Sequence, residues 1–143
     1  MEEKINEIIR GYDVSEIKIA TICSHSALQI FYGAGQEGFE TIGICLKERK
    51  EAYEAFPLGN PDEFIIIDNF KDILKREFQK RLRDENVIII PHGSFVEYVG
   101  PENLKNNFLV PMFGNRKTLE WEGDRKKTKE MVRNSWFGFT ERA

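Results

Sequence analysis

The sequence has 143 residues, the usual size of one globular domain. Its 41% hydrophobic and 31% charged residues argue against the disordered, collagen-like and membrane classes of protein. The net charge of −3 and the pI of about 5.5 give no general attraction to nucleic acid or to a membrane surface, so we expect neither as a partner.

The start of the chain and its cysteines bear on the cellular compartment. Met1-Glu-Glu-Lys-Ile-Asn-Glu7 lacks the basic and apolar regions of a secretory signal, so we expect a cytoplasmic location. Cys23 and Cys45 are too few for a disulfide framework and lack further ligands at metal-site spacing. Their apolar flanks predict reduced, buried side chains.

The first half of the chain predicts strands alternating with helices. A short amphipathic helix over Glu2–Tyr12 precedes a buried strand over Ile17–Cys23. Ser24 can cap a following helix, which Gly33 and Gly35 are expected to close. A strand over Phe39–Leu46 and a short helix over Glu48–Phe56 then repeat this unit.

The second half continues the alternation. The third strand is predicted at Phe64–Asp68, the strongest amphipathic helix at Asn69–Arg83 and the fourth strand at Val87–Pro91. The elements expected after these are a helical stretch around Phe95–Tyr98, a helix from Glu102, a fifth strand at Leu109–Phe113 and a helix of poor period over Asn115–Val132. The fold class is therefore α/β, with about five mostly parallel strands and helices on both faces in a Rossmann-like layer.

The two histidines mark the expected ligand site, because open parallel sheets bind ligands outside the carboxyl ends of their strands. They lie there in Cys23-Ser24-His25-Ser26 and Pro91-His92-Gly93-Ser94. Imidazoles and hydroxyls at helix starts favour an anion such as phosphate, and Gly93 lets the backbone approach it. The plain alternative is that Ser24 and Ser94 are N-caps and that each histidine is a satisfied, half-buried side chain.

Other segments leave two readings open or exclude a site. Asn115 and Arg116 could grip a phosphate or carboxylate, or Asn115 could simply cap a helix. Asp68 could face the ligand crevice or cap the helix that follows. The glycine-rich stretch 33–38 has the spacing of a dinucleotide fingerprint but ends a helix, and there is no P-loop.

Three stretches carry a resemblance to a known family. They are Ile19-Ala-Thr-Ile-Cys-Ser-His-Ser26, Ile88-Ile-Ile-Pro-His-Gly-Ser-Phe95 and Asn107-Phe-Leu-Val-Pro-Met-Phe-Gly-Asn-Arg116. They are similar to the archaeal PurP family, the formate-dependent 5-formaminoimidazole-4-carboxamide ribonucleotide (FAICAR) synthetases of purine (IMP) biosynthesis. The resemblance implies a Rossmann-like preATP-grasp domain followed by an ATP-grasp domain.

The resemblance also implies a reaction and two contact residues. ATP and Mg would activate formate, which the amine of the aminoimidazole carboxamide ribonucleotide AICAR captures. The residues that match the family's AICAR contacts are His25 and Ser94, and the neighbours suggested by spacing alone are Ser24, Ser26, His92, Gly93, Asn115 and Arg116.

The sequence departs from the family's pattern near its end. We expect a preATP-grasp domain over residues 1–125, and a truncated start of the ATP-grasp region or an unrelated tail over 126–143. Three hypotheses follow: a truncated synthetase that binds AICAR with little activity, an AICAR-binding regulatory module or subunit completed by a partner chain, and another enzyme that uses His25 or His92. No ATP, Mg or other metal is expected to bind this chain alone, and a surface left uncovered would favour self-association or a partner.

Overall fold

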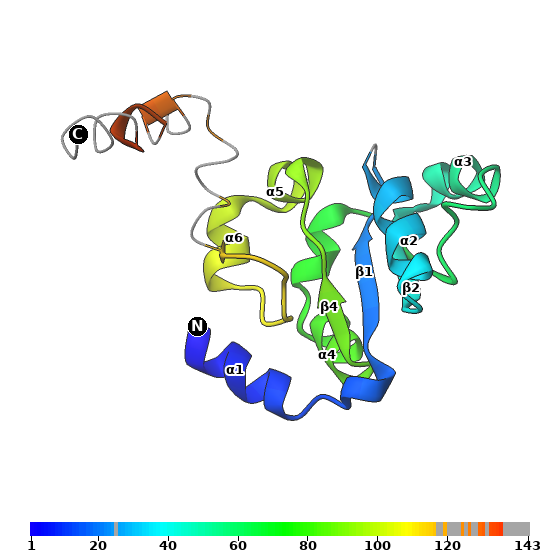
Figure 1. Ribbon diagram of the computed structural model, residues 1–143, viewed down its shortest axis with the longest axis horizontal. Helices are drawn as coiled ribbons and strands as arrows, with labels where there is room; N and C mark the ends of the chain where they lie inside the picture. Colours follow the sequence, from blue (N-terminus) through cyan, green and yellow to red (C-terminus); the bar gives the residue numbers. More distant parts are fainter. Residues whose placement is uncertain are drawn as a thin grey trace.

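The core of the fold is a four-stranded, all-parallel sheet in the order β3-β2-β1-β4. Figure 1 shows β1 beside β4. The computed structural model describes residues 1–24, 26–116, 119, 124, 126, 129, 130 and 132–135. The strands are β1 (Lys18–Ile22), β2 (Glu40–Leu46), β3 (Glu63–Ile67) and β4 (Val87–Ile89). In the register, Ala20 of β1 faces Ile42 of β2 on one side and Ile89 of β4 on the other. The predicted α/β class is confirmed.

The predicted fifth strand forms only one isolated bridge. Met112 pairs in parallel with Ile89, through the bonds from Ile89 N to Pro111 O and from Phe113 N to Ile89 O, each 2.8 Å long. Pro111 has no N–H to extend the ladder, and Gly114, at φ 90°, turns the chain away directly afterwards. The expected strand over 109–113 is therefore reduced to a single residue pair.

The helices alternate with the strands as predicted, with changed boundaries. They are α1 (Glu2–Arg10), η1 (Val14–Glu16), α2 (Ala27–Gln36), η2 (Lys47–Arg49), α3 (Lys50–Glu54), η3 (Phe70–Leu74), α4 (Arg76–Asp84), α5 (Gly93–Val99) and α6 (Pro101–Asn106). The prediction that Gly33 and Gly35 close the second helix was wrong, because α2 runs through both to Gln36.

The single helix predicted over 69–83 is two elements. Asn69 and Asp72 form a capping box at the start of η3, and Lys75 then adopts an extended conformation (φ −62°, ψ 136°) before α4 begins. The Leu74 carbonyl, which a continuous helix would pair with an amide one turn later, accepts from the Gln79 side chain at 3.0 Å. This side chain bond satisfies the carbonyl at the break between η3 and α4.

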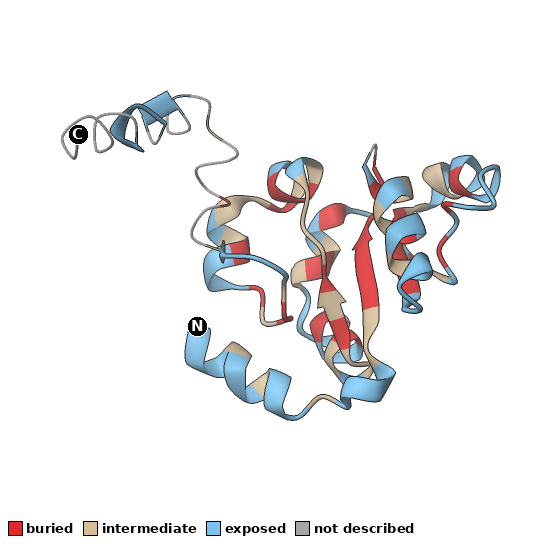
Figure 2. Ribbon diagram, in the orientation of Figure 1, coloured by how far each residue is buried: buried red, intermediate tan, exposed pale blue. Residues whose placement is uncertain are grey.

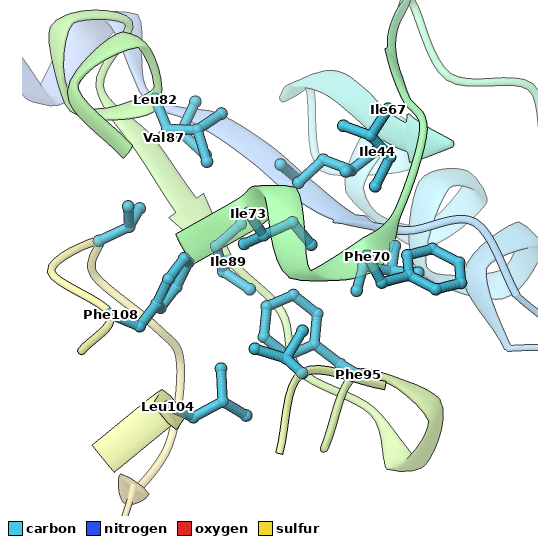
Figure 3. Packing of buried hydrophobic residues seen from close by; sticks show 14 of the residues in the cluster. Ile44, Ile67, Phe70, Ile73, Leu82, Val87, Ile89, Phe95, Leu104 and Phe108 are labelled. Carbon is cyan, nitrogen blue, oxygen red and sulfur yellow. The ribbon is translucent and has the colours of Figure 1, made fainter. Parts of the chain in front are cut away.

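Helices cover both faces of the sheet, as predicted, and divide the core in two. The larger cluster joins alternate strand residues such as Ala20, Ile44 and Ile89 to η3, α4, α5 and α6 (Figure 3). The smaller cluster joins Cys23, Cys45 and Phe64 on the other face to α2 and α3. Figure 2 shows the buried residues along the middle of β1, with the exposed residues on the outer helices.

Both cysteines are reduced and fully buried in the smaller cluster, as the sequence predicted. Burial raises the pKa of the Cys23 thiol and of the Cys45 thiol, which disfavours the reactive thiolate. Within the described residues, no helix is long and apolar enough to cross a membrane. Most of the predicted helix over 115–132 and of the segment 126–143 lies outside the described residues.

Candidate functional site at the carboxyl ends of β1 and β4

The order of the strands places one special position at the carboxyl edge of the sheet. From β1 the chain adds β2 and then β3 on one side, and afterwards returns to place β4 on the other side of β1. The strand order therefore reverses between β1 and β4, and such a switch point is where α/β sheets bind ligands. Ser24 follows β1 and His92 follows β4, so the two segments singled out in the sequence flank this point.

His92 ties the end of β4 to the end of β1. Its Nε2 lies 3.0 Å from the Ile22 carbonyl oxygen, a contact that requires the proton on Nε2 and leaves Nδ1 as an acceptor. The Ser24 hydroxyl lies 3.4 Å from both ring nitrogens and can donate to Nδ1. Burial lowers the pKa of His92, so the ring is neutral at pH 7. His92 thus matches the plain alternative of a satisfied, half-buried histidine that positions its neighbours.

Ser94 differs from His92 in having no hydrogen-bond partner within the described part of the chain. It lies in the first turn of α5, one residue inside the helix, and is half-buried. Among the described residues its hydroxyl makes no hydrogen bond, and the N-cap of α5 is His92. The alternative that Ser94 is an N-cap is therefore wrong. A Cβ added at the preceding Gly93 would meet nothing within 4 Å, so the space beside this turn is open.

Tyr53, which the sequence analysis did not single out, forms a hydrogen bond with the loop after β1. The Tyr53 hydroxyl of α3 donates to the Ser24 carbonyl oxygen. Ser24 is 6% exposed, and its own carbonyl also accepts from the Ala27 amide at 3.1 Å. Ser24 is not the N-cap of α2, which is Ser26, an exposed residue without a side-chain capping bond. The expected capping role of Ser24 was wrong.

Arg49 is a second feature that the sequence reasoning missed. It ends η2, directly after β2, and its guanidinium donates to the Cys23 carbonyl oxygen at 3.1 Å and to the Tyr98 hydroxyl at 3.4 Å. Tyr98 lies four residues after Ser94 in α5, hence on the same face of that helix. The strand-end rule that pointed to the histidines would have found Arg49 too, since it lies three residues past β2.

The remaining candidate residues lie elsewhere or are engaged. His25 lies outside the described residues. Arg116 donates to the carbonyl oxygens of Leu104, Phe108 and Val110, and burial lowers its pKa to about 10. Asn115 is exposed beside it.

Asp68 is not the cap of the helical turn that follows β3, because Asn69 has that role. It lines a shallow hollow beside β3 together with Asp72, Lys75 and Arg81. This hollow shares no residue with the Ser24, His92 and Ser94 group.

The chemistry of a metal site is not found in the described part of the chain. No group of three or more His, Cys, Asp or Glu side chains there could hold a metal ion. We therefore assign no Mg²⁺ ligand among these residues.

Comparisons with known proteins identify the relatives of this chain. A family model described as "Protein of unknown function (DUF1246)" matches residues 19–141. A 5-formaminoimidazole-4-carboxamide-1-(beta)-D-ribofuranosyl 5'-monophosphate synthetase of Korarchaeum cryptofilum is 54% identical over 133 residues, which are 93% of this chain and 36% of that protein. The synthetase of the same description from Methanosarcina acetivorans is 52% identical over 131 residues, with 92% and 36% of the two chains covered.

A solved structure gives the same relationship. The crystal structure of an IMP biosynthesis protein PurP from Thermococcus kodakaraensis matches with a TM-score of 0.61 and 34% identity, over 76% of this chain and 33% of that one. This chain thus spans about a third of the length of the relatives it matches.

Proposed function

Because the chain belongs to the PurP (FAICAR synthetase) family and aligns with the N-terminal third of its relatives, we propose that it binds the nucleotide substrate AICAR at the carboxyl ends of β1 and β4. The relatives are named for a ribofuranosyl 5'-monophosphate product, so their substrate is a nucleotide of similar size and charge. In this proposal Ser94 and His25 contact AICAR, and the neutral ring of His92 holds Ser24 and the end of β1 in place.

One observation carries the proposal. The Ser94 hydroxyl lies at the switch point of the sheet without a hydrogen-bond partner among the described residues, beside an open space at Gly93. A half-buried hydroxyl can donate one hydrogen bond and accept others, which suits the polar edge of a ribonucleotide. His92 and Tyr53 are occupied by bonds to backbone carbonyls and the Ser24 hydroxyl lies against the His92 ring, so Ser94 is a hydroxyl of this group that is available to a ligand.

In the full reaction of the family, ATP, Mg and formate would be needed as well. We place their binding in the ATP-grasp part that the resemblance implies, and give this chain the substrate-binding share of the reaction. When the chain is supplied with ATP, Mg²⁺, formate and AICAR, we expect no FAICAR above the background detected by mass spectrometry. Sustained formation of FAICAR would overturn this division of roles.

Calorimetric titration with AICAR tests the proposed site. The wild-type chain should release or absorb heat on binding, and Ser94→Ala should weaken binding about 5- to 20-fold, the value of one or two hydrogen bonds. Ser15→Ala is the matched control, because Ser15 lies in η1 before the amino end of β1. If folded wild-type protein gives no heat at millimolar AICAR, or if the two serine variants behave alike, the proposed site is wrong.

A further inference from the structure

Arg49 is fixed at the carboxyl edge of the sheet by contacts on several sides. Its guanidinium carbon lies 5.4 Å from the ring centroid of Phe70 and 5.5 Å from that of Tyr98. These two rings stack on each other, with centroids 4.5 Å apart and planes 14° apart. The bonds to the Cys23 carbonyl and the Tyr98 hydroxyl then set the direction of the guanidinium plane. A long, flexible side chain is thus held in one orientation.

The charge of Arg49 has no ion-pair partner in the part of the chain that the structure describes. Some basic residues of the fold form ion pairs, such as Arg81 with Glu63 and Glu85, whereas within the described residues Arg116 bonds only carbonyl oxygens. Arg49 forms no ion pair with any carboxylate of the described residues, and its bonds go to a carbonyl and a phenol. The hydrogen bond with Tyr98 raises the pKa of Arg49 above its ordinary value, which outweighs the opposing effect of partial burial. The guanidinium is therefore charged in the folded chain and can pair with an anion that arrives with a ligand.

The guanidinium of Arg49 borders the site already described and has more donors than its two hydrogen bonds use. A guanidinium has five N–H groups, and the bonds to Cys23 and Tyr98 use two of them. Through Cys23 the guanidinium borders the loop of Ser24, and through Tyr98 it borders the face of α5 that carries Ser94. The planar fork of a guanidinium matches phosphate oxygens in pairs, which an ammonium group cannot do.

We propose that Arg49 is an anion-binding residue of this site and pairs with the phosphate monoester of the bound nucleotide. The inference rests on the proposed function for the identity of the nucleotide, but its geometry stands on the contacts of Arg49 alone. The 5'-monophosphate in the relatives' name supplies an anion of the required kind. Phosphate thereby provides the counter-charge that the described residues do not.

The test compares ligands with and without phosphate on matched variants. Calorimetry is run with AICAR, with its nucleoside lacking the phosphate, and with inorganic phosphate. Arg49→Gln should weaken AICAR about 10- to 100-fold, the range for a charged hydrogen-bonded pair, and leave the affinity for the nucleoside within about 2-fold. Arg10→Gln on α1, before the amino end of β1, makes the same change of charge and should alter neither affinity (Figure 1).

Two additions keep the result decisive if Arg49→Gln folds poorly. Arg49→Lys keeps the charge but not the fork, and should lose an intermediate share of the AICAR affinity. For the wild-type chain, AICAR should bind more tightly as pH rises through about 6, where a phosphate monoester takes its second charge. A thermal unfolding scan of each variant establishes that it is folded at the assay temperature.

The outcomes separate this inference from the proposed function. Equal AICAR affinity in wild type and Arg49→Gln would overturn the inference while the proposed function stands. Equal loss for nucleotide and nucleoside would also overturn it, because Arg49 would then act only by shaping the site. If the wild type binds neither AICAR nor its nucleoside, the proposed function fails. In that case the inference survives only if inorganic phosphate binds and Arg49→Gln abolishes that binding.

Discussion

Replacing Arg116 by methionine is expected to destabilise the fold without touching the substrate site. The guanidinium of Arg116 donates to the carbonyl oxygens of Leu104, Phe108 and Val110, the three fully buried residues that join α6 to the segment paired with β4. A buried carbonyl that loses a donor costs about 1–3 kcal/mol, and three are affected here. The substitution also removes the cost of burying the guanidinium charge, which offsets part of this loss. We therefore expect the free energy of unfolding to fall by about 2–4 kcal/mol.

Urea denaturation followed by circular dichroism measures this loss. The midpoint of Arg116→Met should fall with little change in the slope, and Arg10→Met, an exposed residue of the same type, should stay within about 0.5 kcal/mol of the wild type. AICAR affinity, measured at a temperature where the variant is folded, should not change. A loss below about 1 kcal/mol combined with a clear loss of AICAR affinity would refute this reasoning and return Arg116 to the role of a ligand-gripping residue.

Three further changes test other parts of the structure. A Cβ at Gly43 would lie 2.9 Å from the Cys23 sulfur, so Gly43→Ala should lower the free energy of unfolding by about 1–3 kcal/mol in urea. The Gln79 side chain accepts from the Leu109 amide at 2.7 Å and donates to the carbonyl oxygens of Leu74 and Asn107. Gln79→Leu removes all three bonds, so it should lower the free energy of unfolding by about 2–4 kcal/mol in the same assay. Burial holds the pKa of His92 below its ordinary value of 6.5, so below that pH the unfolded chain binds more protons than the folded chain and stability should fall. His92→Gln should lessen this fall. Equal pH profiles of the unfolding free energy for wild type and His92→Gln would contradict the prediction.

The sequence predicted the sheet well because its signals are local. Short β-branched runs such as Phe64–Ile67 and Val87–Ile90, separated by helical periods, are enough to indicate buried parallel strands. The break inside 69–83 was not predictable in the same way. At the break, the side chain of Gln79 in α4 bonds Leu74 in η3, and it also bonds Asn107 and Leu109 in a distant segment. The spacing of apolar residues does not reveal such contacts.

Ser24, His92 and Ser94 follow the ends of β1 and β4 as the sequence predicted, but their hydrogen-bond partners were not predictable. The rule about strand ends led to His92 and Ser94. Whether such a residue caps a helix or contacts a ligand depends on which of its atoms already have hydrogen-bond partners, and the sequence does not show this. The Ser24 hydroxyl faces the His92 ring and not the start of α2. This orientation depends on how the ends of β1 and β4 pack together. Arg49 was overlooked because it sits in a charged stretch, where a solvated side chain is the usual outcome.

The structure also explains how three kinds of polar side chain come together at one edge of the sheet. The loops after β1, β2 and β4 meet there because parallel strands end together, and each supplies one chemical type: a hydroxyl at Ser24, a guanidinium at Arg49, an imidazole at His92. The hydrogen bonds among them run to backbone carbonyls of neighbouring strands, so the edge is stiffened by the sheet itself. All these groups, with Ser94, lie between residues 24 and 98, at the edge of a sheet that has an apolar cluster on each face.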